Sequence, residues 1–282
     1  MNQKLECFNR QKKYLVCIDS DGSAMDTMDS KHIYCFGPAA VEVYHLENYR
    51  GLFLTIWKKI NLYTMTRGIN RFKGLVIALE QLKELGVGLE DFTALKTWSE
   101  EAQELSNTAL EAEIEETNDP ALKKALEWSK LTNYYIKGLE VQAGTFNGVK
   151  ESIKQIHEVA DIVIVSSANS EALEKEWTEE GLSDYVDLLM GQEAGSKSEC
   201  IAKLKEKGYE EEEILMVGDA PLDLKAAESN KVFYYPILVR REESSWVGLR
   251  TEGIKRLQEG TFKGEYQDNL INAFYENLKA GE

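Results

Sequence analysis

The chain has 282 residues, of which 43% are hydrophobic, enough for one large domain or two modest domains with packed cores. Its 49 acidic and 33 basic residues give a net charge of −16, which opposes binding to polyanions such as nucleic acids and anionic membranes. We therefore expect a globular protein with no nucleic-acid partner and no membrane partner.

The four cysteines show no metal-binding spacing, and Cys17 falls within an apolar run, where it would be a small buried hydrophobe. No basic-then-apolar leader opens the chain, and no apolar segment approaches the roughly 18 residues that cross a bilayer. These features predict a reduced, cytoplasmic protein.

The first predicted element is a strand, YLVCI at residues 14–18, buried on both faces. From residue 24 to residue 144 the chain instead shows long amphipathic helical patterns: NRFKGLVIALEQLKELG, then DFTALKTWSEEAQELSNTALEAEIEE, then a helix that Asp119 caps and Pro120 begins. One core strand precedes this part and at least four follow it. We therefore predict an all-α domain at residues 24–144, inserted into a domain formed by residues 1–23 and 145–282.

Four apolar runs follow the insertion, with helical patterns between them: IVIV at 162–165, VDLLM at 186–190, ILMV at 214–217 and VFYYPI at 232–237. Strands that alternate with helices form right-handed βαβ units and a parallel sheet. The predicted fold class is therefore α/β, a Rossmann-like parallel sheet with helices on both faces, plus the inserted helical domain. The tail from about Ser244 is predicted to be helical.

Polar residues gather where the predicted strands end, which is where open parallel sheets bind ligands. These groups are Asp19, Asp21 and Gly22 after the first strand, Ser166 and Ser167 after the second, Asp219 and Asp223 after ILMV, and Lys197 at a helix start. We expect all four groups to converge on one site.

The first two groups also have ordinary structural explanations. Asp21 and Gly22 form a common turn dipeptide, and an acidic residue that leaves a strand is often only a turn residue. Ser166 or Ser167 could simply cap the helix that follows.

The other two groups have similar alternatives. Ser196 and Glu199 form a capping-box motif around Lys197, so a solvated lysine in a first helical turn is the favoured alternative there. Asp223 lies just inside a helix that Pro221 begins, where an acidic residue is favourable whatever its function.

Taken together, the groups point to phosphate chemistry. Three carboxylates at the ends of two neighbouring strands would repel one another, so a bound cation is expected. Oxygen ligands with room for water and phosphate favour Mg²⁺ over Ca²⁺. A lysine ammonium and a serine hydroxyl would complement phosphate oxygens. The set predicts Mg²⁺-dependent phosphoryl transfer on a small phosphorylated substrate.

The segments DSDGS, VSS, GSKSE and GDAPLD resemble, in order and spacing, the four motifs of the haloacid dehalogenase-like hydrolase superfamily. The helical insertion after the first motif resembles the cap of the phosphoglycolate phosphatase and β-phosphoglucomutase branch. Members of this superfamily that cleave carbon–halogen bonds lack the second aspartate of the first motif. The presence of Asp21 therefore favours a phosphate ester as substrate.

The resemblance implies a role for each matching residue. Asp19 would be the nucleophile that forms an aspartyl-phosphate, and Asp21 would be the general acid for the leaving group and then the base for water. The metal would be held by Asp19, Asp21 through its backbone carbonyl, Asp219 and Asp223, and the phosphoryl group by Ser166, Ser167 and Lys197.

The resemblance also places substrate selection in the cap. Arg67 and Arg71 lie in TRGINRFKG, its most basic stretch, and are candidates to meet an anionic substrate. A solvated loop and helix start is the favoured alternative for such a charge run.

The predicted function is thus a Mg²⁺-dependent phosphatase for a small phosphorylated metabolite. Two alternatives stay open: a phosphomutase, which would pass the phosphoryl group to a second hydroxyl, and a phospho-accepting regulatory module.

Overall fold

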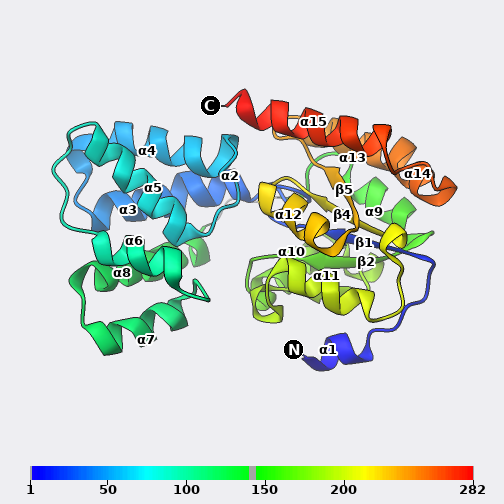
Figure 1. Cartoon of the computed structure of the whole chain (residues 1–282), viewed down its shortest axis with the longest axis horizontal. Helices are drawn as coiled ribbons and strands as arrows, with labels where there is room; N and C mark the ends of the chain where they lie inside the picture. The colour runs from blue at the N-terminus through cyan, green and yellow to red at the C-terminus, as the bar shows by residue number, and fades with distance from the viewer. Residues whose placement is uncertain (1, 140–143, 282) are drawn as a thin grey trace. The chain divides into compact units, whose positions relative to one another are not determined.

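The computed structural model describes residues 2–139 and 144–281 of the chain. The chain divides into two compact units (Figure 1). The α/β unit comprises Met1–Thr27 and Ala143–Ala280, and the helical unit comprises Met28–Gln142 and Gly281–Glu282.

The first boundary between these units differs from the predicted one, because residues 24–27 belong to the α/β unit. Met25 forms a β-bridge with Thr145, and the Asp26 N–H donates to the carbonyl of Gly144 at 2.9 Å. These bonds pair the segment that leads out of the α/β unit with the segment that returns to it.

The α/β unit contains a five-stranded parallel sheet in the order β3-β2-β1-β4-β5. Its strands are β1 (Tyr14–Ile18), β2 (Ala160–Val165), β3 (Leu188–Met190), β4 (Ile214–Gly218) and β5 (Phe233–Pro236). All five predicted strands are therefore confirmed. β1 is central, and its residue Cys17 is in register with Val163 of β2 and Met216 of β4.

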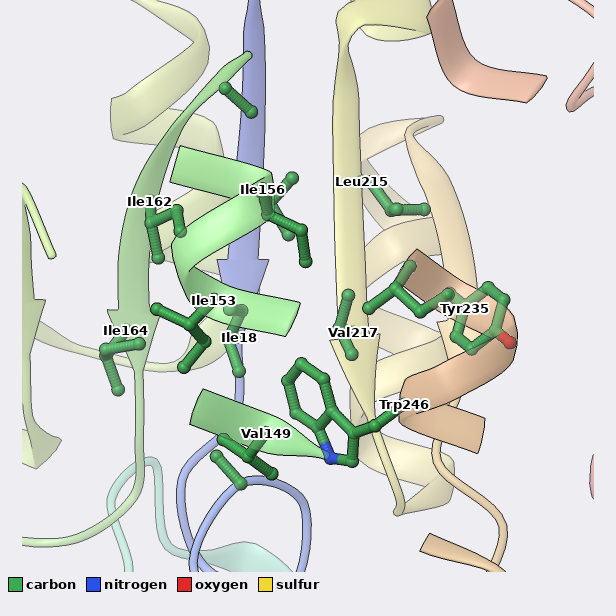
Figure 2. Packing of buried hydrophobic residues seen from close by; sticks show 14 of the residues in the cluster. Ile18, Val149, Ile153, Ile156, Ile162, Ile164, Leu215, Val217, Tyr235 and Trp246 are labelled. Carbon is green, nitrogen blue, oxygen red and sulfur yellow. The ribbon is translucent and has the colours of Figure 1, made fainter. Parts of the chain in front are cut away.

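Helices cover both faces of this sheet. On one face, side chains of β1, β2 and β4 pack against helices α9 (Val149–His157), α10 (Ser170–Glu179) and α13 (Glu242–Gly248). Figure 2 labels ten of the residues in this cluster. On the other face α11 (Lys197–Lys205) packs on α12 (Pro221–Asn230), which contacts β4 and β5. The predicted α/β fold class is confirmed.

The α/β unit also has short 3₁₀-helices at Ser183–Tyr185, Gln192–Ala194 and Glu211–Glu213, and its remaining α-helices lie at the two ends of the chain. They are α1 (Asn2–Cys7), α14 (Ile254–Glu259) and α15 (Glu265–Lys279), with a π-helical segment at Leu249–Gly253. The predicted helical tail is confirmed, and its last helix, α15, packs against β5.

The helical unit consists of short and medium-length helices around an aromatic core. They are α2 (Met28–Lys31), α3 (Gly37–Val43), α4 (Arg50–Lys58), α5 (Arg71–Glu84), α6 (Thr93–Glu101), α7 (Asn107–Thr117) and α8 (Pro120–Lys137), with π-helical segments at His32–Phe36 and Lys59–Tyr63. Trp57 and Trp128 are fully buried at the centre, with their rings 5.9 Å apart.

Two helix predictions in this unit are confirmed and one is wrong. The pattern NRFKGLVIALEQLKELG forms α5, which Asn70 caps. Asp119 caps α8 by accepting the N–H groups of Ala121 and Leu122, as predicted. The pattern at residues 91–116 forms two helices rather than one, because Ser106 accepts the N–H of Ala109 and starts α7 as a new helix. Within the described residues, no helix combines the length and the apolar character needed to span a membrane.

A buried hydrogen-bond cluster ties the amino end of β2 to two other segments. Asp161 is fully buried, and its Oδ2 accepts the N–H groups of Gln11 at 2.9 Å and Lys12 at 3.0 Å. The hydroxyl of Tyr209 donates to the same oxygen. This cluster lies at the opposite edge of the sheet from the carboxyl ends of the strands.

We expect Tyr209→Phe to lower the free energy of unfolding by about 1–3 kcal/mol, because the buried Asp161 carboxylate loses one of its three donors. Urea unfolding of the full chain measures the change. Tyr134→Phe, at a side chain that is 72% exposed, should change the unfolding free energy by less than about 0.5 kcal/mol. Equal stabilities of the Tyr209 variant and the native chain would contradict the importance of this cluster.

Candidate functional site

The first predicted group lies where β1 ends. Asp19 is buried, and its N–H donates to the carbonyl of Val217 at 2.9 Å, which continues the pairing of β1 with β4 by one residue. Its Oδ1 accepts the N–H of Ser20 at 2.8 Å. Gly22 has a φ of 80°, a left-handed conformation that favours glycine, so the Asp21-Gly22 dipeptide does form a turn.

Asp21 is less buried than Asp19 and belongs to the same turn. Its Oδ1 accepts the hydroxyl proton of Thr27. Thr27 could not be identified from the sequence, because a threonine six residues after Asp21 belongs to no motif. This contact fixes one side of the Asp21 carboxylate.

The group that follows β4 is held by the backbone of its own turn. Asp223 is fully buried in the first turn of α12, and its Oδ2 accepts the N–H groups of Asp219 at 3.1 Å and Ala220 at 3.0 Å. A Cβ at Gly218 would lie 2.3 Å from the same oxygen. Only glycine at position 218 therefore leaves the Asp223 carboxylate its place.

Lys197 joins the two groups of carboxylates. Its Nζ lies 2.8 Å from Asp19 Oδ1 and also pairs with Asp223 Oδ1, and only 13% of the side chain is exposed. Ser196 and Glu199 do form the predicted capping box at the start of α11. The alternative of a solvated lysine is nevertheless wrong, because this first helical turn directs the ammonium into the site.

The acidic residues form a compact cluster with oxygen atoms within 4.8 Å of one another: Asp19, Asp219 and Asp223. Burial raises the pKa of Asp19 well above its ordinary value; Lys197 opposes this shift, and the two other carboxylates add to it. Burial lowers the pKa of Lys197, but its carboxylate neighbours outweigh burial and the net shift is upward.

One ammonium thus faces three buried carboxyl groups, and the surplus of negative charge is what a divalent cation would offset. The donors are all oxygen atoms, the ligands that hard cations prefer. The cluster is therefore chemically suited to holding such a cation.

The serine group follows β2. Ser166 is buried; its N–H donates to the carbonyl of Met190 at 2.9 Å, and its Oγ accepts the N–H of Ala168 at 3.1 Å. Ser167 is exposed. The capping alternative is wrong for both serines, because Asn169 caps α10.

Arg67 and Arg71 belong to the helical unit. Arg67 is only 2% exposed and donates to the carbonyl of Leu62 at 2.5 Å, so the alternative of a solvated loop is wrong for it. Arg71 donates to Ser129 Oγ at 3.1 Å and Asn133 Oδ1 at 2.8 Å. Burial lowers the pKa of Arg71 to about 10.

Comparison with known proteins identifies the family. The family model described as haloacid dehalogenase-like hydrolase matches residues 87–235, just over half of the chain. The matched part contains Ser166, Lys197, Asp219 and Asp223, whereas Asp19 precedes it. No curated protein sequence matches the chain.

Two solved structures share the fold at low sequence identity. A candidate phosphoglycolate phosphatase from Lactobacillus delbrueckii subsp. bulgaricus is 15% identical, with 79% of this chain and 85% of that chain covered and a TM-score of 0.50. A predicted phosphoglycolate phosphatase from Haemophilus somnus is also 15% identical, with 80% of this chain and 85% of that chain covered and a TM-score of 0.50. From the family match over more than half of its length, the chain belongs to the haloacid dehalogenase-like hydrolase family.

Proposed function

We propose that the chain is a Mg²⁺-dependent phosphatase that hydrolyses a small phosphorylated metabolite through an aspartyl-phosphate on Asp19. The observation that carries this proposal is the contact of one buried lysine with two buried carboxylates from separate elements: Lys197 contacts Asp19 at the end of β1 and Asp223 in the first turn of α12. Family membership and the phosphatases among the solved structures of similar fold support it.

The two aspartates of the first motif have different roles in the first half-reaction. An oxygen of Asp19 attacks phosphorus and forms a P–O bond while the bond to the leaving oxygen breaks. Asp21, two residues away, gives its proton to that leaving oxygen. Ser166 and Lys197 hold the phosphoryl oxygens by a hydroxyl donor and a positive charge.

In the second half-reaction Asp21, now a carboxylate, takes a proton from water, and the resulting nucleophile attacks phosphorus and releases Asp19. Asp19, Asp219 and Asp223, with the Asp21 carbonyl, would hold Mg²⁺. The ion when bound supplies positive charge that offsets the phosphate and keeps Asp19 ionised.

Substrate selection is proposed for the helical unit, and Arg71 is its better candidate contact. The Arg71 guanidinium lies over the Phe36 ring at 5.0 Å and donates to two neutral side chains. Within the described part of the chain, no carboxylate pairs with it, so its charge is left for an anionic group of a substrate. Arg67, bonded to a backbone carbonyl, is better suited to packing.

We expect Asp19→Asn to lower the rate of p-nitrophenyl phosphate hydrolysis in the presence of Mg²⁺ by about 10³-fold or more, because an amide is not a nucleophile for phosphorus. Asp184→Asn, at an exposed position of the same unit, should leave the rate unchanged. Activity that survives the Asp19 substitution would refute the mechanism. With sugar phosphates as substrates, an isomerised product without free phosphate would indicate the phosphomutase instead.

We further expect Mg²⁺ at millimolar concentration to raise the midpoint of thermal unfolding by several degrees, because a ligand that binds only the folded state stabilises it by mass action. Gly218→Ala should abolish this rise, because the added methyl group displaces the Asp223 carboxylate. Gly51→Ala is the matched control, since a Cβ at Gly51 meets nothing within 4 Å. If Mg²⁺ leaves the midpoint of thermal unfolding of the native chain unchanged, the cation site is ruled out.

A further inference from the structure

Ser20 links the two aspartates of the first motif and has no exposed surface. Its N–H donates to the carboxylate of Asp19 at 2.8 Å. Its carbonyl accepts the N–H groups of Ala24 at 2.9 Å and Met25 at 2.8 Å, and so closes the turn that contains Asp21. A rotation of Ser20 would therefore move the Asp19 carboxylate and the Asp21 turn together.

The side chain of Ser20 is anchored from a distant helix. The indole Nε1–H of Trp177, in α10, donates to Ser20 Oγ at 3.0 Å across 157 positions of sequence. Trp177 is fully buried and packs in the same hydrophobic cluster as Met25 and Ile164. An indole N–H is a donor with no acceptor capacity, so it needs an acceptor in the core and has one in this hydroxyl.

A second indole holds the other end of the turn. Trp246, in α13, is fully buried, and its Nε1–H donates to the carbonyl of Ser23 at 2.9 Å. Its ring lies beside Val149 and Val217 in the core (Figure 2). The two residues that flank Asp21 and Gly22 are thus each hydrogen-bonded to a buried tryptophan.

The geometry points to Trp177 as a positioning residue, whose hydrogen bond to Ser20 sets the relative placement of Asp19 and Asp21. The role rests on the proposed function, in which both carboxylates act on one phosphorus. Misplacement of a reacting group by about 1 Å costs on the order of 10²-fold in rate. A residue that holds the peptide between the two carboxylates therefore controls turnover without touching the substrate.

Trp177→Phe tests the role, since phenylalanine keeps an aromatic ring in the core and removes the N–H. We expect kcat for p-nitrophenyl phosphate to fall about tenfold while KM changes by less than about twofold. Ser20→Ala removes the same hydrogen bond from the smaller partner and should cause a similar loss. The double variant should be no slower than either single variant, because the two substitutions delete one interaction.

Tyr209→Phe is the control for a purely structural effect, because it removes a buried hydrogen bond at the opposite edge of the sheet. It should lower stability and leave kcat unchanged. If Trp177→Phe behaves in the same way, or if the losses from Trp177→Phe and Ser20→Ala multiply, the positioning role is wrong.

Amide hydrogen exchange separates failure of this role from failure of the proposed function, because it needs no turnover. In Trp177→Phe, the amides of Ala24 and Met25 should exchange at least several-fold faster than in the native chain, whereas in Tyr209→Phe they should not. Unchanged exchange in Trp177→Phe would overturn the role. A native chain without phosphatase activity would overturn the proposed function, and faster exchange would then still support Trp177 as the residue that holds this turn.

Discussion

A buried ammonium paired with two buried carboxylates is the interaction on which the carboxyl edge of the sheet depends. Lys197 brings the start of α11 against Asp19 at the end of β1 and Asp223 in α12. Removing one partner of a buried pair leaves an uncompensated charge at a cost of about 3–5 kcal/mol, so each of the three segments constrains the other two. The same constraint requires glycine at position 218, since the Asp223 carboxylate occupies the space that a side chain would fill there.

The same edge combines a charged centre with an apolar support. The turn from Asp19 to Met25 is closed by hydrogen bonds to the Ser20 carbonyl. Two indole N–H groups from the hydrophobic core also donate to it. Hydrogen bonds from Trp177 and Trp246 are shielded from water, which strengthens them and makes their loss costly. The carboxylates of this turn are therefore held in place by tryptophans of the hydrophobic cluster.

The strands of the sheet and the polar residues that follow them could be predicted from the sequence, because each strand is a short, β-branched run buried on both faces. Asp19 and Asp223 could also be predicted as site residues, because the end of a strand and a helix start marked by proline can both be recognised from neighbouring residues. The environment of Lys197 could not be predicted, because the capping-box sequence is the same whether the lysine faces water or a carboxylate. That choice is made by the packing of α11 on α12, which joins distant parts of the chain.

The helical unit was harder to predict for a related reason. The helical pattern at residues 91–116 did not reveal the break between α6 and α7, although Ser106, which caps α7, is a local sign of it. Arg67 looked solvated in a basic stretch, yet its guanidinium is bonded to the carbonyl of Leu62. The two indole contacts of the turn from Asp19 to Met25 were equally hidden, because Trp177 lies 157 positions from Ser20.

The bridge between Met25 and Thr145 has a consequence for the insertion as a whole. The two segments that connect the helical unit to the sheet are joined to each other within the α/β unit by this bridge and by the hydrogen bond from the Asp26 N–H to the Gly144 carbonyl. The spacing between the two ends of the insertion is therefore set by the α/β unit itself, and a change in the length of the inserted segment need not alter that spacing.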